Sequence, residues 1–157
     1  MLILWPTEHD DTIALFPVEP PDGVKHWPEI KRQRAFLNEL AMVAPHVFAF
    51  AIPNAGKRNP RLAKLEGITA GVFDLALCWG AGNTAWCEWK GYTAAGCAGV
   101  LSKEQKEWGN RMTRLGHHCA AFFTPAACFE WLREIGVPMN RLVERKDFRQ
   151  KKKPGER

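Results

Sequence analysis

The amino-acid sequence predicts an α/β fold, in which a mixed sheet of about four strands is flanked by helices. Two helices carry clear start and stop signals, at residues 102–116 and 124–136. Short apolar runs between the helices have the length of buried strands. Only "GAGN" (80–83) separates two of these runs, which predicts a hairpin. Strands that alternate with helices after a hairpin imply a mixed sheet, in the order α-β-β-β-α-β-α.

The first helix is expected to begin after Pro28, because proline is favoured at the start of a helix. It continues through "EIKRQRAFLNELAM", and its inward side is expected to carry Glu29, Gln33, Phe36, Leu37 and Leu40. The run "HVFAFAI" (46–52) reads as a strand that ends at Pro53. A polar, basic loop follows at 54–67, with a helical turn near its end.

The hairpin strands are expected at 72–79 and 84–90, and a fourth strand at 118–123. Ser102 and Gln105 have the spacing of a capping box at the start of the helix expected at 102–116. The inward stripe of that helix is expected to be Gln105, Trp108, Met112 and Leu115, and Gly116 ends it. The last helix starts at Thr124 and Pro125, before the stop signals Gly136 and Pro138.

Length and composition fit one globular domain with a real core. We expect an acidic, proline-bearing extension at 1–27, a folded domain at 28–137 and a basic tail at 138–157. No apolar run reaches the roughly 20 residues that a membrane span requires, so no membrane association is expected. The start lacks a basic region and makes a poor signal peptide. Cys78, Cys87 and Cys119 lie in apolar runs and read as reduced core thiols, which indicates the cytoplasm.

The formal net charge of +5 is weak evidence for nucleic acid, but its distribution is informative. A compact basic cluster lies inside the domain, at Lys57, Arg58, Arg61 and Lys64. These cations can follow a phosphate backbone, or they can belong to an ordinary solvated loop.

The stretch "TAWCEWKGY" (84–92) places an acid and a base two residues apart in an otherwise apolar strand. Glu88 and Lys90 therefore share a face of the sheet. Asp74, from the neighbouring strand, can lie beside Glu88, and two carboxylates on one face suit Mg²⁺. Lys90 can then orient a water or stabilise charge on a phosphate. The alternative is an exposed ion pair.

Two further residues have double interpretations. Glu29 heads a core-facing stripe and can meet a metal or a base, or it can be an acid favoured by the helix dipole. Gln105 can contact the scissile phosphate, or it can only close its capping box.

Several blocks occur in one order: Glu29, Gln33, Ala35 and Phe36, then "IPNAGKR" (52–58), "AKLEGITAGVFDL" (63–75), "EWK" (88–90) and "GVLSKEQKEW" (99–108). Together they resemble the VRR-NUC domain, the virus-type replication-repair branch of the PD-(D/E)xK nucleases, over roughly residues 29–136. The resemblance implies a restriction-endonuclease-like core and Mg²⁺- or Mn²⁺-dependent cleavage of DNA, without a small-molecule cofactor. It implies metal-site groups at Glu29, Asp74, Glu88 and the Trp89 backbone carbonyl, a catalytic Lys90 and a phosphate-side Gln105. Asn54 and Gly56 fall in its "IPN.G" block.

Two departures from the family pattern stand out. Phe73 replaces the usual proline before the aspartate, and the segment "GYTAAGCAG" (91–99) carries no cation. Standalone members of the family resemble dimeric junction resolvases, so we expect a homodimer that acts on branched DNA, in a bacterial or phage-infected cell. The alternatives are a nuclease with flap, nicking or duplex specificity, and a non-catalytic DNA-binding module with the same fold.

The proposed metal site sets a geometric condition on the hairpin. Pairing of Trp79 with Thr84 would place Asp74 opposite Trp89, on the wrong face from Glu88. We therefore expect an odd loop length or a bulge that places Asp74 near Glu88.

Overall fold

The computed structural model describes residues 10–53 and 60–140. Its elements are α1 (Glu29–Val43), β1 (Phe48–Ala51), α2 (Pro60–Leu65), β2 (Leu75–Trp79), β3 (Asn83–Trp89), α3 (Lys103–Arg114), β4 (His118–Phe122) and α4 (Pro125–Glu134). The predicted mixed sheet with flanking helices is confirmed, and α2 is the helical turn expected in the basic loop. β2 begins three residues later than expected, after a segment in which Gly71 has a positive φ and packs against the backbone of Glu104.

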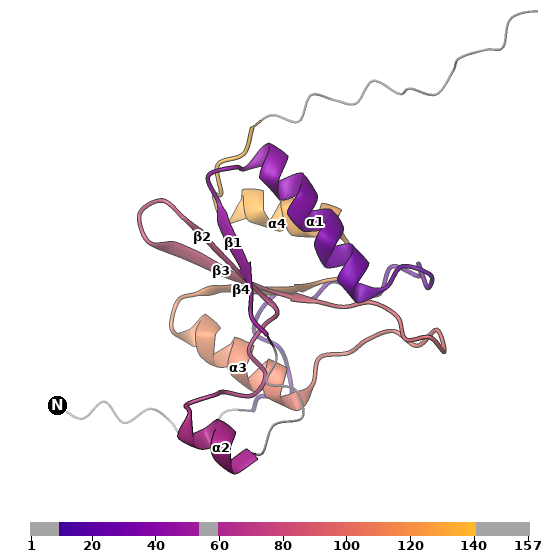
Figure 1. The fold of residues 1–157 in the computed structure, drawn as a ribbon, viewed down its shortest axis with the longest axis vertical. Coiled ribbons are helices and arrows are strands. Elements are labelled where there is room, and N and C mark those ends of the chain that lie inside the picture. The colour runs from indigo at the N-terminus through magenta and orange to yellow at the C-terminus, as the bar shows by residue number, and fades with distance from the viewer. Residues whose placement is uncertain (1–9, 54–59, 141–157) are drawn as a thin grey trace, which may run out of the picture.

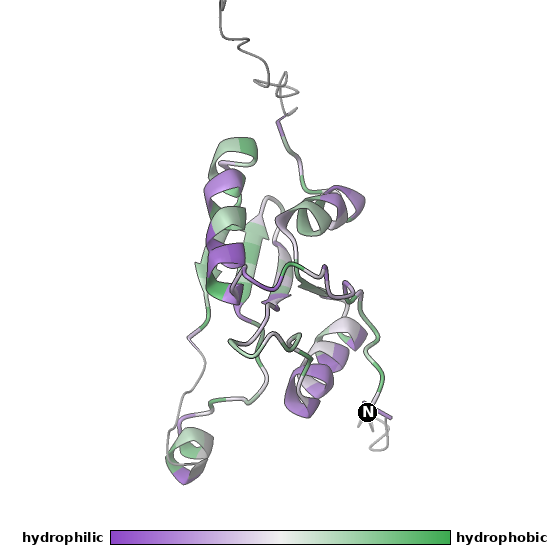
Figure 2. Cartoon of the chain, turned by 90° about the vertical axis from the view of Figure 1, so that its right-hand side faces the viewer, coloured by the Kyte–Doolittle hydropathy of each residue, from purple (hydrophilic) through white to green (hydrophobic). Residues whose placement is uncertain are grey.

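The four strands lie in the order β1-β2-β3-β4, so that β1 and β4 are the outer strands. The pairs β1–β2 and β2–β3 are antiparallel, and β3–β4 is parallel. α1 and α4 cover one face of the sheet and α3 covers the other (Figure 1). Figure 2 shows that the strands are mainly hydrophobic, while the helices alternate between hydrophobic and hydrophilic turns. No helix in the described part of the chain is long and apolar enough to cross a membrane.

Each face of the sheet has its own apolar core. The core under α1 and α4 includes Phe36, Leu77 and Trp89, all fully buried. The smaller core under α3 combines Phe16, Phe73 and Cys119 with partly buried side chains. The alternation of side chains along β3 therefore separates Trp89 from Trp86, which packs in the α3 core.

The interior side of α3 differs in one respect from the expected stripe. Leu115 was expected to face inward, yet it is 52% exposed and this expectation is wrong. The helix ends there, and the buried positions belong to Gly109 and Asn110. A Cβ at Gly109 would lie 2.4 Å from the Phe16 ring, so a larger residue there would force this ring to move. Asn110 binds the N-terminal segment through Leu15, Asp11 and Ile13.

The N-terminal segment lies along the outer side of β4. Val18 pairs with Ala121 in parallel, and the flanking backbone groups of Pro17 and Glu19 complete the hydrogen bonds. The Glu19 carboxylate accepts hydrogen bonds from the N–H groups of Phe123 and Thr124. Residues 16–19 therefore cover the β4 edge, and we call them the strap.

A buried arginine fixes the passage from the strap into α1. Arg32 is fully buried and forms an ion pair of 2.7 Å with Asp22. It also donates to the carbonyl groups of Val24, Trp27 and Phe123. Its guanidinium group lies 4.9 Å from the centroid of the Trp27 ring.

The cysteines fit the reduced state expected for them. All five are free thiols. Cys87 and Cys119 are buried, and Cys78 is half-buried. Burial raises the pKa of Cys119 to about 12, so this thiol stays protonated.

The Arg32→Met variant should lose about 3–5 kcal/mol of unfolding free energy, because it leaves a partly buried Asp22 carboxylate without its cation. Arg34→Met, at an exposed position of the same helix, should change stability by less than about 0.5 kcal/mol. Urea unfolding of both variants measures the difference. Equal stability of the two would show that the Arg32 interactions contribute nothing net.

Candidate active site

The turn between β2 and β3 sets the geometry of the site. Trp79 pairs with Asn83, so that three residues form the loop, and Leu75 pairs with Cys87. Ala81 and Gly82 both have positive φ values, of 61° and 75°. The odd loop length expected from the sequence is confirmed. The same register, continued by one residue, brings Asp74 opposite Glu88 on one face of the sheet.

The backbone beyond this pair is held by Asp74. The Trp89 N–H donates to Asp74 Oδ2 over 3.1 Å, where a ladder hydrogen bond would otherwise continue. Within a strand the N–H and C=O of one residue point to the same side. The Trp89 carbonyl, which the family resemblance names as a metal-site group, therefore points to the side on which Asp74 lies.

Glu88, Lys90 and Gln105 form a buried polar cluster on this face. Lys90 Nζ lies 2.6 Å from Glu88 Oε1 and 3.1 Å from Gln105 Oε1. Gln105 Nε2 donates a short hydrogen bond to the same Glu88 oxygen. Glu88 is 1% exposed and Lys90 is 8% exposed. The pair is therefore buried, and the alternative of an exposed surface ion pair is excluded for this structure.

The second carboxylate oxygen of Glu88 has no partner. Glu88 Oε2 is buried and forms no hydrogen bond in the structure. A buried oxygen of this kind costs free energy unless a ligand or an ion meets it. The position of Oε2 is therefore the strongest structural indication of a binding site in the described residues.

The electrostatics of the cluster favour a bound cation. Burial and the nearby Asp74 carboxylate raise the pKa of Glu88 to about 7, although Lys90 opposes the shift. Desolvation by surrounding protein atoms also raises the pKa of Glu29, although much of this residue is exposed; Lys90 lowers this pKa and Asp74 raises it further. Three carboxyl groups thus influence one another around a single lysine.

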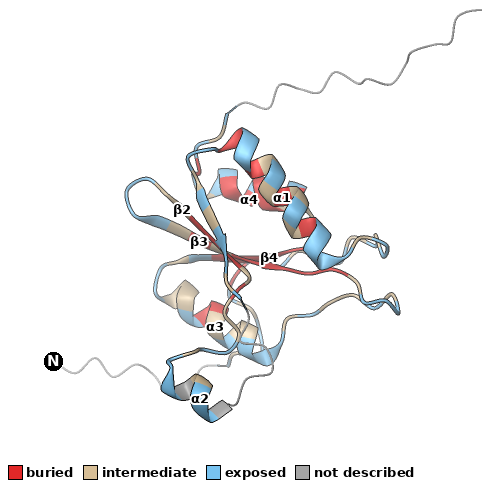
Figure 3. Ribbon diagram, in the orientation of Figure 1, coloured by how far each residue is buried: buried red, intermediate tan, exposed pale blue. Residues whose placement is uncertain are grey.

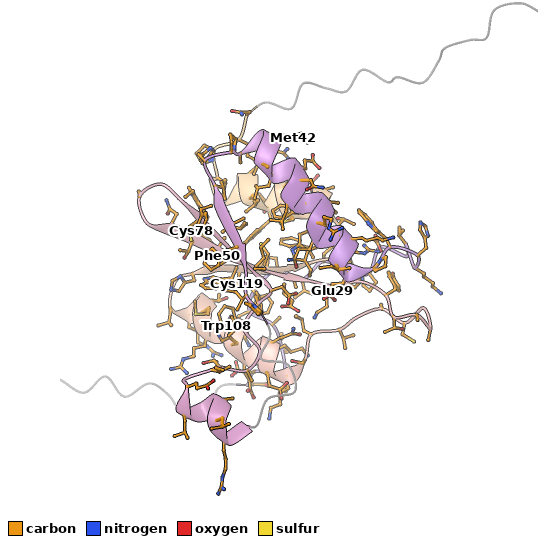
Figure 4. All side chains as sticks on the ribbon, viewed as in Figure 1. Glu29, Met42, Phe50, Cys78, Trp108 and Cys119 are labelled. Atoms are coloured by element: carbon orange, nitrogen blue, oxygen red, sulfur yellow. The ribbon has the colours of Figure 1, made fainter. Side chains whose placement is uncertain are left out.

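Glu29 reaches this region from the other layer of the fold. It is the first residue of α1, at the end of that helix that lies near the sheet (Figure 4). Gly91, which follows Lys90, allows the approach, because a Cβ on Gly91 would lie 2.5 Å from the Glu29 backbone nitrogen. Glu29 itself is largely on the surface, so it was wrong to place it within an inward stripe.

Gln105 closes its capping box, which is one of its two expected roles, and its contact with a phosphate stays a prediction. Its side chain accepts from the Ser102 N–H and its own N–H donates to Ser102 Oγ, which completes the capping box. The same side-chain oxygen accepts from Lys90. The start of α3 and the position of the lysine are therefore coupled through one amide group.

The residues present fit a hard divalent cation. Mg²⁺ prefers oxygen donors and is commonly held by one or two carboxylates together with waters. Asp74, Glu88 and the Trp89 carbonyl supply such donors. Glu88 Oε2 accepts no hydrogen bond in the structure, so its lone pairs are available to an ion. Among the described residues, no group of three or more His, Cys, Asp or Glu side chains is close enough to hold a metal on its own. Water would therefore have to complete the coordination.

The other predicted site residues are placed only in part. Arg61 is exposed in the first turn of α2. Asn54, Lys57 and Arg58, and the side chain of Lys64, lie outside the described residues. Phe73, which replaces the family's proline, is buried and packs between the rings of Phe16 and Trp108, with centroids 5.2 Å and 5.0 Å away.

Comparisons with protein-family models, with curated proteins and with solved structures found no match for this chain. The candidate site therefore depends on the geometry given above and on the resemblance in the sequence.

In EDTA, the free energy of unfolding should fall as the pH rises from about 4.5 to about 7, because the folded protein holds the Glu88 proton more tightly than the unfolded chain does. The stability is fully present below this window and is lost through it, by about 1–3 kcal/mol. Glu88→Gln should flatten the profile, whereas the exposed Glu130→Gln should not. Urea unfolding across the pH range is the measurement. A profile unaltered by Glu88→Gln would contradict the assignment.

Proposed function

We propose that this protein is a metal-dependent DNA endonuclease of VRR-NUC type, which hydrolyses phosphodiester bonds. The observation that carries the proposal is the buried Glu88 carboxylate. One of its oxygens is held by Lys90 and Gln105, and the other has no partner. Asp74 lies opposite it in register. This arrangement supports the restriction-endonuclease-like core that the sequence resemblance implies.

Asp74, Glu88 and the Trp89 carbonyl would hold Mg²⁺ or Mn²⁺ together with waters. The resemblance adds Glu29 to this metal site, although the three carboxylates do not form a close group in the described structure. Such an ion, when bound, polarises a phosphate oxygen and lowers the pKa of a bound water. Lys90 supplies a positive charge on the same face, within reach of negative charge that develops on a phosphate. Gln105 fixes both Glu88 and Lys90 by hydrogen bonds, so its loss should loosen the cluster.

The proposed substrate is branched DNA, such as a four-way junction, within DNA repair in a bacterial or phage-infected cell. A two-fold junction suits a homodimer with two active sites. The net charge of +5 favours association with a polyanion. Flapped, nicked and simple duplex DNA are the alternative substrates.

A non-catalytic DNA-binding module is the second candidate, and one observation favours it. Lys90, Gln105 and one oxygen of Glu88 already satisfy one another within the fold. A buried ion pair of this kind can be a purely structural feature. The unpartnered Glu88 Oε2 favours the nuclease over this candidate.

Cleavage of labelled DNA separates the candidates. Linear, flapped and four-way DNA are incubated with the full chain in Mg²⁺, Mn²⁺ or EDTA. A nuclease cleaves at least one of these substrates and stops in EDTA. Binding without cleavage in either metal would favour the DNA-binding module.

Lys90→Met should lower single-turnover cleavage on the order of a hundred- to a thousand-fold, because the lysine stabilises charge that appears only in the transition state. DNA binding in Ca²⁺ should change little. Lys103→Met, at an exposed position of α3, is the matched control and should cleave normally. Raised Mn²⁺ should restore part of the activity of Glu88→Gln but none of that of Lys90→Met. Wild-type cleavage by Lys90→Met would contradict the nuclease proposal.

Arg58→Ala and Arg61→Ala should each weaken DNA binding without moving the cleavage position, because phosphate contacts carry no sequence information. Each should lower the slope of log affinity against log salt by about one unit. Titrations at several salt concentrations measure this slope. If affinity and slope stay unchanged in both variants, the two arginines belong to a solvated loop.

A further inference from the structure

The two outer strands of the sheet differ in whether another segment pairs with their free edge. The strap covers the outer side of β4 through Val18. On the outer side of β1, none of the described residues forms a strand pair. An open edge presents unpaired N–H and C=O groups and invites pairing with another strand.

The open edge of β1 lacks the features that usually protect such edges. The run Val47–Ile52 contains no charged residue, and prolines occur only outside it, at 45 and 53. Phe48 is 67% exposed and Phe50 is 38% exposed, and their rings contact each other with centroids 5.4 Å apart. Figure 3 shows β1 in the colours of exposed and intermediate residues beside largely buried strands.

The apolar surface continues from β1 onto α1. A groove of about 320 Å³ between the two elements is lined by Leu37, Ala41, Pro45 and Phe48, among others. Met42, on the same helix, is 63% exposed. Exposed apolar surfaces of this kind are typical of interaction sites.

We propose that β1 pairs with β1 of a second copy of this chain, in antiparallel orientation about a two-fold axis. The paired sheet then has eight strands. The proposal stands on the open edge and does not depend on the proposed nuclease activity.

The backbone directions fit this pairing. The Ile52 N–H donates to the Asp74 carbonyl, toward β2. By alternation, the N–H and C=O groups of Ala49 and Ala51 point away from β2, to the open side. The Val47 N–H is already bonded to the Ala44 carbonyl. The outward groups that are available are therefore centred on Ala49.

A register centred on Ala49 makes the strand complementary to itself. Ala49 then exchanges two hydrogen bonds with Ala49 of the second copy, and Ala51 donates to the Val47 carbonyl on each side. Phe48 lies opposite Phe50 in non-hydrogen-bonded pairs, where side chains approach most closely. Pro45 and Pro53 lie at equal distances from Ala49 and end the pairing symmetrically.

The second copy is favoured over an unrelated partner for two reasons. The strand has no charged side chain with which a different partner could form an ion pair. In a pair of identical strands, each Phe48 ring lies opposite a Phe50 ring and the two Ala49 methyl groups lie opposite each other. Within the described residues each copy has one open edge, so the pairing closes as a dimer and does not extend into a fibre.

The two-fold axis would be perpendicular to the sheet, so equivalent faces of the two copies lie on the same side. Glu88 and Lys90 share their face with Phe48 and Phe50, as the strand registers require. Both Glu88 clusters of the dimer would therefore face the same side. One duplex or junction lying across that side could meet both.

The test is the mass of the full chain by light scattering at micromolar concentration, without metal or DNA. The wild type should have about twice the 17.8 kDa mass of one chain. Ala49→Pro removes one outward N–H but none that β1 donates to β2, so it should fold and give a twofold lower mass. Ala49→Val keeps the N–H and should stay dimeric.

A second pair of variants keeps the test decisive if Ala49→Pro does not fold. Phe48→Lys/Phe50→Lys and Phe48→Glu/Phe50→Glu should each be monomeric, and their equimolar mixture should regain the doubled mass. Val100→Lys, at an exposed site elsewhere, should remain dimeric.

A wild type with the mass of one chain, or a dimer that persists in all β1 variants, overturns the proposal. If the wild type is monomeric and both double variants bind single-stranded DNA more weakly, the rings serve bases and not a second copy. Loss of cleavage with an intact dimer would count against the nuclease alone.

Discussion

The register of the β2–β3 hairpin is the constraint on which the candidate site depends. With three residues in the turn, Asp74 and Glu88 share a face; with four, Asp74 would oppose Trp89 on the other face. The apolar side chains enforce the choice, because Leu75 and Leu77 must lie in the core under α1 and α4. Hydrophobic burial of one face thus positions the carboxylates on the other. The positive φ of Ala81 is the local conformational cost of that turn.

The polar cluster is tolerated because α3 divides its face of the sheet into two zones. Trp108 and Phe73 fill the apolar zone, with ring centroids 5.0 Å apart. Gln105, one helical turn earlier, belongs to the polar zone and binds Glu88 and Lys90. Because the same amide closes the capping box, the helix start cannot shift without moving the lysine. The remaining oxygen, Glu88 Oε2, is desolvated without a hydrogen bond, and a bound cation would offset this free-energy cost.

The sequence predicts those parts of the fold that rest on local signals. Ser102 and Thr124 cap their helices as expected. The odd number of residues in the hairpin loop follows from the alternation of side chains along the two strands. Arg32 was not foreseen, because nothing local distinguishes a buried arginine from its exposed neighbours on a helix. The strap also escaped prediction, since a single bridge at Val18 has no periodicity. Their partners are up to about a hundred residues away in sequence, and single-sequence patterns do not contain such distances.

The strap changes how residues 10–27 relate to the site. Expected as an extension, they contribute Phe16 to the α3 core and Glu19 to the start of α4. Asp22 then holds Arg32, three residues beyond Glu29, while the Gly23 N–H donates to the Tyr92 hydroxyl. The strap and the residues that follow it therefore bind both the first turns of α1 and the segment that follows β3 after Lys90. Glu29 comes from the α1 layer and Lys90 from the end of β3 in the sheet, and these contacts tie the two segments together. It follows that the geometry of the cluster depends on a segment that contributes none of its side chains.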